Sequence, residues 1–348
     1  MKTFSEKLFM NELRKKYRPA TIIEVARRAG VSPATVSRVL NGTAAVVPET
    51  EQRVREAIAE LNFTPHPAAR QLINQRTNAI GLLLPEISGE FFPPMLRGIE
   101  AEVRNSGYDL LIHSTQENLN SGRRPLREHN TDGLIVFPES VDDAELHRLF
   151  KIGFPVLLLH QSSPEGISFP IVTVENKSGA EMLINHLIEA HGRRRIVYLQ
   201  GPESHQDSRW RERGYRDALE SHGIPFDPEL VEYGGFDEAE ACDAIRQMLI
   251  DGVDFDAVFA GDDDAATGVI AALKQAGRDI PGDVAVVGFD DVPFSRFISP
   301  SLTTIRAPIE QVGREAVKQL VSLIEKGHAE PEILLPTEII IRQSCGCP

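Results

Sequence analysis

The spacing of hydrophobic positions changes along the chain and divides it into two parts. Before about residue 64, apolar residues recur three or four positions apart, the period of an amphipathic helix. From Asn78 onward, short apolar runs alternate with helical stretches, which indicates parallel sheets covered by helices, and the length of this part suggests two lobes. The runs that predict strands are Ile80–Leu84, Leu110–His113, Leu134–Phe137, Val156–Leu159, Ile171–Val174, Ile196–Leu199, Ala257–Ala260 and Val284–Phe289.

Two short helices joined by a tight turn are predicted near the start of the chain. Thr21 and Glu24 have the spacing of a capping box, in which hydroxyl and carboxylate satisfy bare backbone N–H groups. Gly30 ends the first helix, since glycine adopts a left-handed conformation without a Cβ clash. Ser32 followed by Pro33 begins the second, because Ser is a good N-cap and Pro at the first helical position loses only an unpartnered N–H.

The second helix sorts its residues onto two faces. One face can pack on Val25, Ala26 and Ala29 of the first helix, and it consists of Val36, Val39 and Leu40. The other face is short and polar, and it consists of Ala34, Ser37, Arg38 and Asn41. Such a face suits a helix in the DNA major groove, where arginine can donate two hydrogen bonds to guanine. A small helical pair within an ordinary bundle is the alternative. A third helix is predicted from Pro48 to about Leu61, with Val54, Ile58 and Leu61 on its buried side.

The run Val25-Ala-Arg-Arg-Ala-Gly-Val-Ser-Pro-Ala-Thr-Val-Ser-Arg-Val-Leu-Asn-Gly42 resembles the DNA-binding segment of the LacI/GalR family of bacterial transcription regulators. The resemblance implies a homodimer that binds double-stranded operator DNA through Thr21, Ser32, Pro33, Ala34, Thr35, Ser37, Arg38 and Asn41. The sequence departs from the family at Val47, where a capping Ser is common, at a cost of about 1 kcal/mol of local stability. Pro33 and Ala34 are poor readers of bases, so this helix does not define the operator sequence.

The segment from Phe63 to Asn74 resembles the hinge of that family, a linker that becomes helical when two copies meet on the operator. Leu72 stands at the position that enters the minor groove, where an apolar wedge offsets the cost of unstacking a base step. The resemblance also places His66 and Ala69 among the DNA contacts. A plain interdomain linker is the alternative, but Pro65 and Pro67 are typical of a helix start.

Charge is distributed unevenly between the two parts. Residues 1–76 hold 13 Lys and Arg against 7 Asp and Glu, and the remainder holds 24 against 44, so the net charges are +6 and −20. The basic end can approach phosphates, although much of its excess lies in residues 1–20, which we expect to form a flexible tail. No apolar run is long enough to cross a bilayer and the start lacks a secretory pattern, so we expect a cytoplasmic protein with no membrane partner.

The expected fold is an N-terminal all-α helix-turn-helix domain followed by an α/β two-lobed Rossmann-like effector domain of the periplasmic-binding-protein type. The expected domains are the tail at 1–20, the helix-turn-helix domain at 21–64, the hinge helix at 65–76 and the effector-binding and dimerisation domain at 77–348. Within the last, the resemblance implies an N-lobe of about 77–175 and 308–333 and a C-lobe of about 176–307 and 334–348. The tetrameric member of that family carries a leucine-rich C-terminal helix, whereas this sequence has Gln343-Ser-Cys-Gly-Cys-Pro348 in its place. The resemblance therefore implies a dimer.

Ligands of such folds bind at the carboxyl ends of strands, in the cleft between lobes. By resemblance, the effector-binding residues are Phe91, Phe92, His160, Arg211, Phe236, Asp262 and Asp290. Sugar hydroxyls can donate to Asp290 while accepting from Arg211, and an aromatic face can cover a sugar ring. The alternatives are a structural ion pair of Arg211 with Asp290, and a core role for Phe92 and Phe236. Asp262 stands where Asn is frequent, which adds acceptor capacity.

The function expected is a transcription regulator, a repressor, that a small molecule controls, with a sugar or sugar derivative as the expected effector. A purine- or nucleoside-responsive regulator of the same fold and a solute-binding protein of a sugar transporter are the alternatives. No nucleophile elbow, Walker loop or His-Glu-x-x-His pattern is present, so no catalytic residue, enzyme activity or cofactor is expected. Cys345-Gly-Cys347 would be half a metal site, but the sequence pattern shows no second pair, so no metal is expected.

Overall fold

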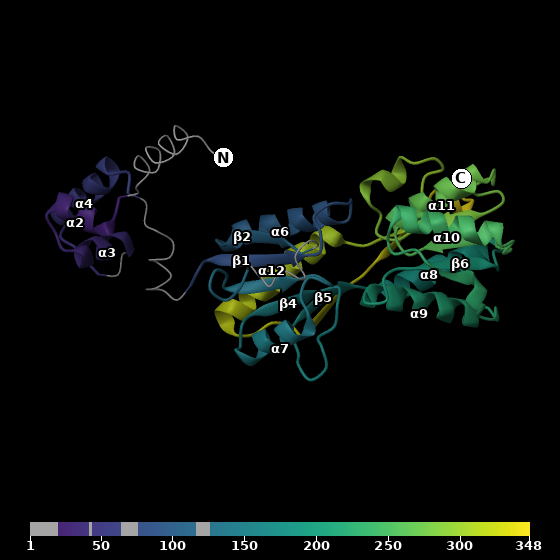
Figure 1. Cartoon of the computed structure of the whole chain (residues 1–348), viewed down its shortest axis with the longest axis horizontal. Helices are drawn as coiled ribbons and strands as arrows, with labels where there is room; N and C mark the ends of the chain where they lie inside the picture. The colour runs from purple at the N-terminus through teal and green to yellow at the C-terminus, as the bar shows by residue number, and fades with distance from the viewer. Residues whose placement is uncertain (1–19, 42–43, 64–75, 116–125) are drawn as a thin grey trace, which may run out of the picture. The chain divides into compact units, whose positions relative to one another are not determined.

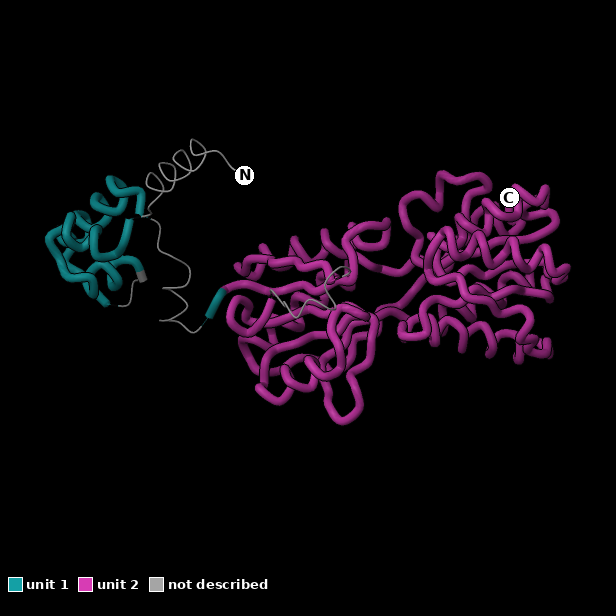
Figure 2. Tube along the Cα trace, viewed as in Figure 1, with its two compact units in different colours: residues 1–77 teal, residues 78–348 magenta. Residues whose placement is uncertain are grey.

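A computed structural model describes residues 20–41, 44–63, 76–115 and 126–348 of the 348-residue chain. The chain divides into two compact units, residues 1–77 and 78–348, which are described separately (Figure 2). Within the described residues no helix is long and apolar enough to span a membrane.

The first unit contains three helices, α2 (Ile22–Ala29), α3 (Pro33–Asn41) and α4 (Pro48–Glu60). The predicted capping box is present, because Thr21 N donates to Glu24 Oε2 at 2.7 Å and Glu24 N donates to Thr21 Oγ1 at 3.3 Å. Gly30 ends α2 in the left-handed conformation, at φ +67°. Val47 precedes α4 without a side-chain cap. A small apolar core holds the three helices together, and its fully buried members are Val25, Ala26, Ala29, Val36, Val54 and Ala57.

One lobe of the second unit is built on a six-stranded parallel sheet of order β11-β5-β4-β3-β1-β2 (Figure 1). These strands are β1 (Ala79–Leu84), β2 (Asp109–Ser114), β3 (Gly133–Val136), β4 (Val156–Leu159), β5 (Ile171–Val174) and β11 (Glu332–Leu335). Helices α6 (Phe92–Ser106) and α12 (Ile309–Lys326) pack together in one apolar cluster, whereas α7 (Asp143–Lys151) belongs to a separate cluster. Two covered faces explain why β1, β3 and β4 are buried along their whole length.

The other lobe is built on a four-stranded parallel sheet of order β7-β6-β8-β9. These strands are β6 (Ile196–Gln200), β7 (Val231–Tyr233), β8 (Ala257–Ala260) and β9 (Ala285–Val287). Helices α8 (Asn176–His191) and α9 (Gln206–Ser221) pack in one apolar cluster, and α10 (Glu238–Ile250) and α11 (Asp263–Gln275) pack in another. Strands β10 (Thr304–Arg306) and β12 (Glu338–Ile340) form an antiparallel pair.

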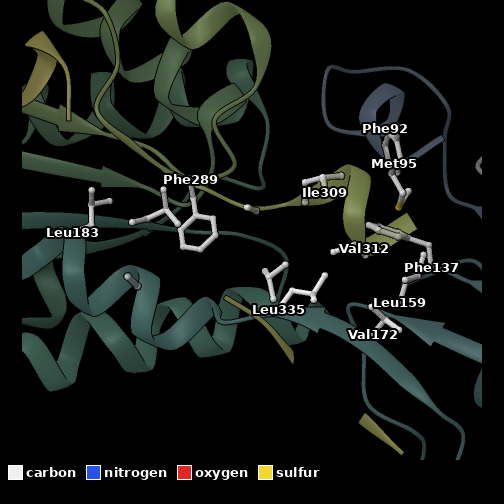
Figure 3. Packing of buried hydrophobic residues seen from close by; sticks show 14 of the residues in the cluster. Phe92, Met95, Phe137, Leu159, Val172, Leu183, Phe289, Ile309, Val312 and Leu335 are labelled. Carbon is white, nitrogen blue, oxygen red and sulfur yellow. The ribbon is translucent and has the colours of Figure 1, made fainter. Parts of the chain in front are cut away.

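The chain passes between the lobes where β5 leads into α8, where β10 leads into α12, and where β11 leads into β12. Strand β11 pairs with β5 as far as Leu335, two residues beyond the boundary expected at 333. One apolar cluster extends through both lobes, as Figure 3 shows for Leu183 and Phe289 on one side and Phe92 and Val312 on the other. The crossing segments therefore run through continuous packing.

The parallel sheets and their covering helices confirm the predicted fold class. Each of the eight predicted strands is present, and β4, β5 and β8 have the predicted bounds. Four strands were missed, namely β7, β10, β11 and β12, each three or four residues long. Strands β7 and β11 are partly exposed, and β10 and β12 pair with each other at the lobe junction. These strands therefore lack the continuous apolar run that marks a buried strand.

Candidate functional site

The polar face predicted for DNA contact is carried by α3. Ser32 begins this helix, since Thr35 N donates to Ser32 Oγ at 3.2 Å. Pro33, Ala34 and Arg38 are exposed, whereas Val36 on the opposite face is buried in the small core. Because the helix is amphipathic, the short side chains of Pro33 and Ala34 and the guanidinium of Arg38 face solvent and not the core. Thr21 lies in the capping box described above, and His66, Ala69 and Leu72 lie outside the described residues, as does the side chain of Asn41.

A cavity of about 270 Å³ lies between the two lobes of the second unit. The residues that follow β1, β3 and β4 in one lobe and β6, β7, β8 and β9 in the other line it, so it opens at the carboxyl ends of both sheets. All seven residues predicted to bind the effector line this one cavity: Phe91, Phe92, His160, Arg211, Phe236, Asp262 and Asp290.

Arg211 lies on α9 with its side chain almost entirely buried. Its guanidinium donates to Asn176 Oδ1 at 2.9 Å, to the Gly261 carbonyl at 2.6 Å and to Asp290 Oδ1 at 3.2 Å. The Phe289 ring lies 3.8 Å from the guanidinium carbon. These contacts fix the planar group from several sides, so it presents a preorganised cation at the cavity wall. The ion pair considered as an alternative is present, and both of its members also line the cavity.

Aromatic rings from both lobes flank the charged wall. Phe91 and Phe92 lie edge to face, with centroids 5.5 Å apart, at the start of α6. Phe92 belongs to the buried core, whereas Phe91 is partly buried. Across the cavity, the Phe236 ring packs against the backbone of Gly201, where an added Cβ would come within 2.2 Å of the ring. Glycine at 201 therefore makes the room that Phe236 needs.

A hydrogen bond crosses the cavity from one lobe to the other. His160 follows β4, and its Nδ1 lies 2.8 Å from Asp207 Oδ2 on α9. Burial acts to raise the pKa of Asp207, but the charge and hydrogen bond of His160, together with Arg211, outweigh it, so the pKa is lowered. His160 Nε2 is buried and has no hydrogen-bond partner among the described residues. This nitrogen is available to a bound molecule.

The cavity wall is acidic. Six carboxylates line it, against the single arginine: Glu86, Glu139, Asp207, Asp262, Asp264 and Asp290. Burial raises the pKa of Asp264 to about 6, and the charge of Asp290 adds to this. Burial also raises the pKa of Asp262 well above its ordinary value, although Asp262 Oδ1 accepts from Ala265 N at 2.7 Å as the cap of α11. Such a wall favours ligands that donate hydrogen bonds and disfavours anions.

Backbone strain gathers at the same cavity. Seven non-glycine residues of the described chain have positive φ, and four of them line the cavity. These are Glu139 (φ +63°), His160 (φ +51°), Phe236 (φ +58°) and Asp290 (φ +105°). Such conformations persist where the surroundings hold them, and they concentrate at ligand sites.

The sequence did not single out several lining residues, among them Glu139, His205 and Asp207. Ser204 Oγ donates to Glu139 Oε1 across the lobes, and His205 Nε2 lies 3.8 Å from Glu139 Oε2. Glu139 follows the predicted strand 134–137, and Asp207 precedes Arg211 by one helical turn. The available signals were the position of Glu139 after a strand end and the helical spacing of Asp207 to Arg211.

Fold and cavity together define a class: a helix-turn-helix head on a two-lobed ligand-binding domain. Residues 21–66 match the family of bacterial regulatory proteins of the lacI type, and residues 184–345 match the periplasmic binding protein-like domain. The chain is 37% identical over 334 residues to the HTH-type transcriptional regulator RegA of Clostridium acetobutylicum, an alignment that covers 94% of this chain and 99% of RegA. The chain belongs to the LacI family of bacterial transcription regulators.

Other relatives carry regulator names. The chain is 33% identical to the ribose operon repressor of Halalkalibacterium halodurans, covering 93% of this chain and 96% of that protein. It is also 33% identical to GalR of Escherichia coli, covering 94% and 96%. Among solved structures, a CelR–cellobiose complex matches with TM-score 0.69 at 31% identity, covering 94% of this chain and all of that one. A lac repressor dimer bound to operator and an anti-inducer matches with TM-score 0.79 at 25% identity, covering 94% and 99%. The predicted family and regulatory function are confirmed.

Proposed function

We propose that this regulator is a repressor that binds a pseudo-palindromic operator as a homodimer in the cytoplasm, and that a neutral sugar in the interlobe cavity controls it. In this proposal residues 21–64 form the DNA-binding head, 65–76 the hinge and 77–348 the effector and dimerisation domain. The lacI-type head and the repressor names of relatives support the DNA part. They favour a regulator over a transport receptor, which would share the lobes alone.

The observation that carries the ligand assignment is the composition of the cavity wall. Phe91 and Phe236 offer aromatic faces, and acidic side chains around Arg211 offer acceptors for hydroxyl groups. A sugar ring has apolar C–H faces and a rim of hydroxyls, so it complements both. A phosphorylated sugar would bring its charge against a wall that has six acidic side chains and one arginine. A purine could also stack on phenylalanine, and it remains the second ligand class.

Coupling between ligand and DNA is proposed to run through lobe orientation. The His160–Asp207 hydrogen bond joins the lobes, and both of its residues line the cavity. A ligand that contacts either residue therefore changes the free energy of the lobe arrangement in which this bond is formed. Because the coupling is thermodynamic, effector and operator alter each other's affinity by the same factor.

A binding assay tests the DNA part. Labelled duplexes from the gene's own promoter region are titrated with the purified full chain at 50 and 200 mM salt. We expect a specific complex that weakens on the order of 10³-fold or more over that range, as counterion release requires. A dimer that binds no duplex from this region, with or without candidate effectors, would refute the proposal.

A thermal-shift screen tests the ligand part. Neutral monosaccharides and disaccharides are compared with their phosphate esters and with nucleosides and purines. A ligand at a hundred times its Kd adds about 2.7 kcal/mol of stability, which a melting curve resolves. We expect a neutral sugar to raise the Tm and its phosphate ester to have little effect. Stronger stabilisation by the ester would contradict the charge argument, and stabilisation by purines alone would assign the second ligand class.

A further inference from the structure

Two histidines at the end of α8 and two cysteines near residue 346 are distant in sequence but lie close together in the fold. His186 and His191 lie in the last two turns of α8, Cys345 ends the short helix η3 (Gln343–Cys345), and Cys347 follows it. One ligand atom from each of the four residues lies within 4.8 Å of all the others. None of the four lines the interlobe cavity.

The distances in this cluster match those around a tetrahedral zinc ion. With Zn–S of about 2.3 Å and Zn–N of about 2.0–2.1 Å, tetrahedral angles place sulfur and nitrogen about 3.6 Å apart. Cys347 Sγ lies 3.6 Å from His186 Nε2 and 3.4 Å from His191 Nε2. The two imidazole rings are nearly perpendicular, at 81°, with centroids 5.0 Å apart. The Nε2 atoms of both rings thus lie within 3.6 Å of the same sulfur.

The backbone between the cysteines fits the cluster closely. Gly346 has φ +112°, and an added Cβ would come within 3.0 Å of His191 Nδ1. A residue with a side chain would therefore be strained in conformation and would press on the histidine ring. The spacing H-x₄-H is common in zinc sites, whereas C-x-C is tighter than usual. With Gly346 between them in a left-handed conformation, both sulfurs still lie within 4.8 Å of the two histidine nitrogens.

Neighbouring groups hold the buried cysteine in place. Cys345 is fully buried, and its Sγ lies 3.1 Å from Thr303 Oγ1 and 3.3 Å from the Arg342 carbonyl oxygen. The one hydroxyl proton of Thr303 can be donated to this sulfur or to the same carbonyl oxygen, which is 3.0 Å away. Thr303 in turn is tied to the Arg342 backbone, whose N–H donates to Thr303 Oγ1 at 2.8 Å. A hydrogen bond donated to sulfur is what a metal-bound thiolate accepts from its surroundings. The site therefore has an oriented ligand with its own supporting contact.

We propose that His186, His191, Cys345 and Cys347 bind one Zn²⁺ ion. Two thiolates and two imidazoles are ligands that select zinc over magnesium or calcium. Four protein ligands complete a tetrahedron, so the ion is structural and has no open position. It fastens the chain segment that follows β12 to the end of α8, and because binding requires the folded arrangement, it stabilises the C-terminal lobe.

The test uses the untagged full chain, purified under reducing conditions without chelator. Elemental analysis should find one zinc per chain. Removal with a chelator should lower the Tm by on the order of 5 °C, and added Zn²⁺ should restore it. Titration of the chelated protein with Co²⁺ should give the intense visible bands of tetrahedral cobalt together with thiolate charge-transfer absorption.

Variants assign the ligands. Cys347→Ser and His191→Asn alter partly exposed positions, and each should abolish the cobalt spectrum and reduce zinc below one per chain. Cys242→Ser, at a buried position in α10, and His129→Asn, at an exposed position, change the same residue types outside the cluster and should retain both. Reduced protein that retains no zinc and gives no tetrahedral cobalt spectrum would overturn the proposal and leave a hydrogen-bonded cluster. A Cys345–Cys347 disulfide in protein alkylated at isolation would overturn it in favour of a redox pair.

Discussion

The DNA-binding head and the interlobe cavity are two functional surfaces built in different ways. The residues predicted on α3 come from one uninterrupted stretch, and Pro33, Ala34 and Arg38 among them are exposed. The cavity is lined by residues from Pro85 to Asp290 that follow seven strand ends in two lobes, and Asp207, Arg211 and Asp290 among them are buried. A local motif therefore reveals the first surface, and only the topology of two sheets assembles the second.

The two surfaces also differ in how much a substitution is expected to change the free energy of unfolding. An exposed side chain can be removed without leaving a partner stranded in a low dielectric, whereas a buried ion pair cannot. Substitutions of the buried charges at the cavity should therefore affect both ligand binding and folding, whereas substitutions of exposed residues on α3 should affect DNA binding alone. The predictions that follow test this difference from the largest expected effect to the smallest.

Arg211→Ala is expected to have the largest effect. It removes the ion-pair partner of buried Asp290 and the donors to Asn176 and Gly261. Leaving a buried charge without its partner costs about 3–5 kcal/mol, and the effector response should be lost as well. Chemical denaturation and a ligand titration measure the two losses.

Two further variants separate folding from binding at this position. Arg211→Met combined with Asp290→Asn removes both charges, so it should regain much of the lost stability without regaining ligand binding. Arg213→Ala, on the exposed side of the same helix, should change neither quantity. If the double variant still responds fully to the effector, Arg211 and Asp290 act only as a structural pair.

Arg38→Ala should affect the head and not the cavity. Loss of one bidentate guanine contact costs about 1–3 kcal/mol of operator binding and relaxes preference at one base of each half-site. The Tm and effector affinity should be unchanged, because Arg38 is exposed. A gel shift against operators changed at single positions makes the measurement. Arg55→Ala, exposed on α4 and paired with Glu51, is a control for loss of a cation from the head. Equal losses for both variants would mean that Arg38 contributes charge and no base recognition.

Asp264→Asn should stabilise the protein in a pH-dependent way. The pKa of this carboxyl is about 6 in the folded protein and near 3.8 when unfolded, so its ionised form disfavours folding. The penalty is absent below about pH 3.8, grows as the pH rises and is complete above about pH 6. The variant should therefore raise the Tm at pH 7.5, on the order of 4 °C, and have little effect near pH 4. An equal gain at both pH values would show that the charge of Asp264 is not its cause.

The same contrast explains what the sequence could predict. Helix ends in the head depend on near neighbours, so Thr21 with Glu24 and the turn at Gly30 could be recognised from spacing alone. Buried strands such as Val156–Leu159 were recognisable because both faces are covered and the run is uniformly apolar. The seven cavity residues were placed through resemblance to a family and not through periodicity.

What was missed depends on contacts between distant segments. The short strands β10 and β12 exist because the chain returns to the lobe junction, and their residues carry no strong pattern. Asp207 bonds His160, 47 positions earlier, and no local signal pairs them. Likewise, Cys345 and Cys347 offered only half a metal site until the fold brought the end of α8 beside them.

The smallest expected effect concerns the ends of the helices in the head. Thr21→Ala removes the hydroxyl that accepts from Glu24 N, so the head should lose about 0.5–1 kcal/mol of stability. Val47→Ser supplies the side-chain cap that α4 lacks, so a gain in stability of similar size is expected. Because the three helices share one small core, a change at either cap affects the stability of the whole head. Hydrogen exchange of the amides in α2 and α4 measures both changes locally, with the amides of β4 as an internal reference. The double variant should return near the starting value, since the two caps lie at separate helix ends. If Val47→Ser destabilises the head instead, Val47 contributes more by packing than a cap would add.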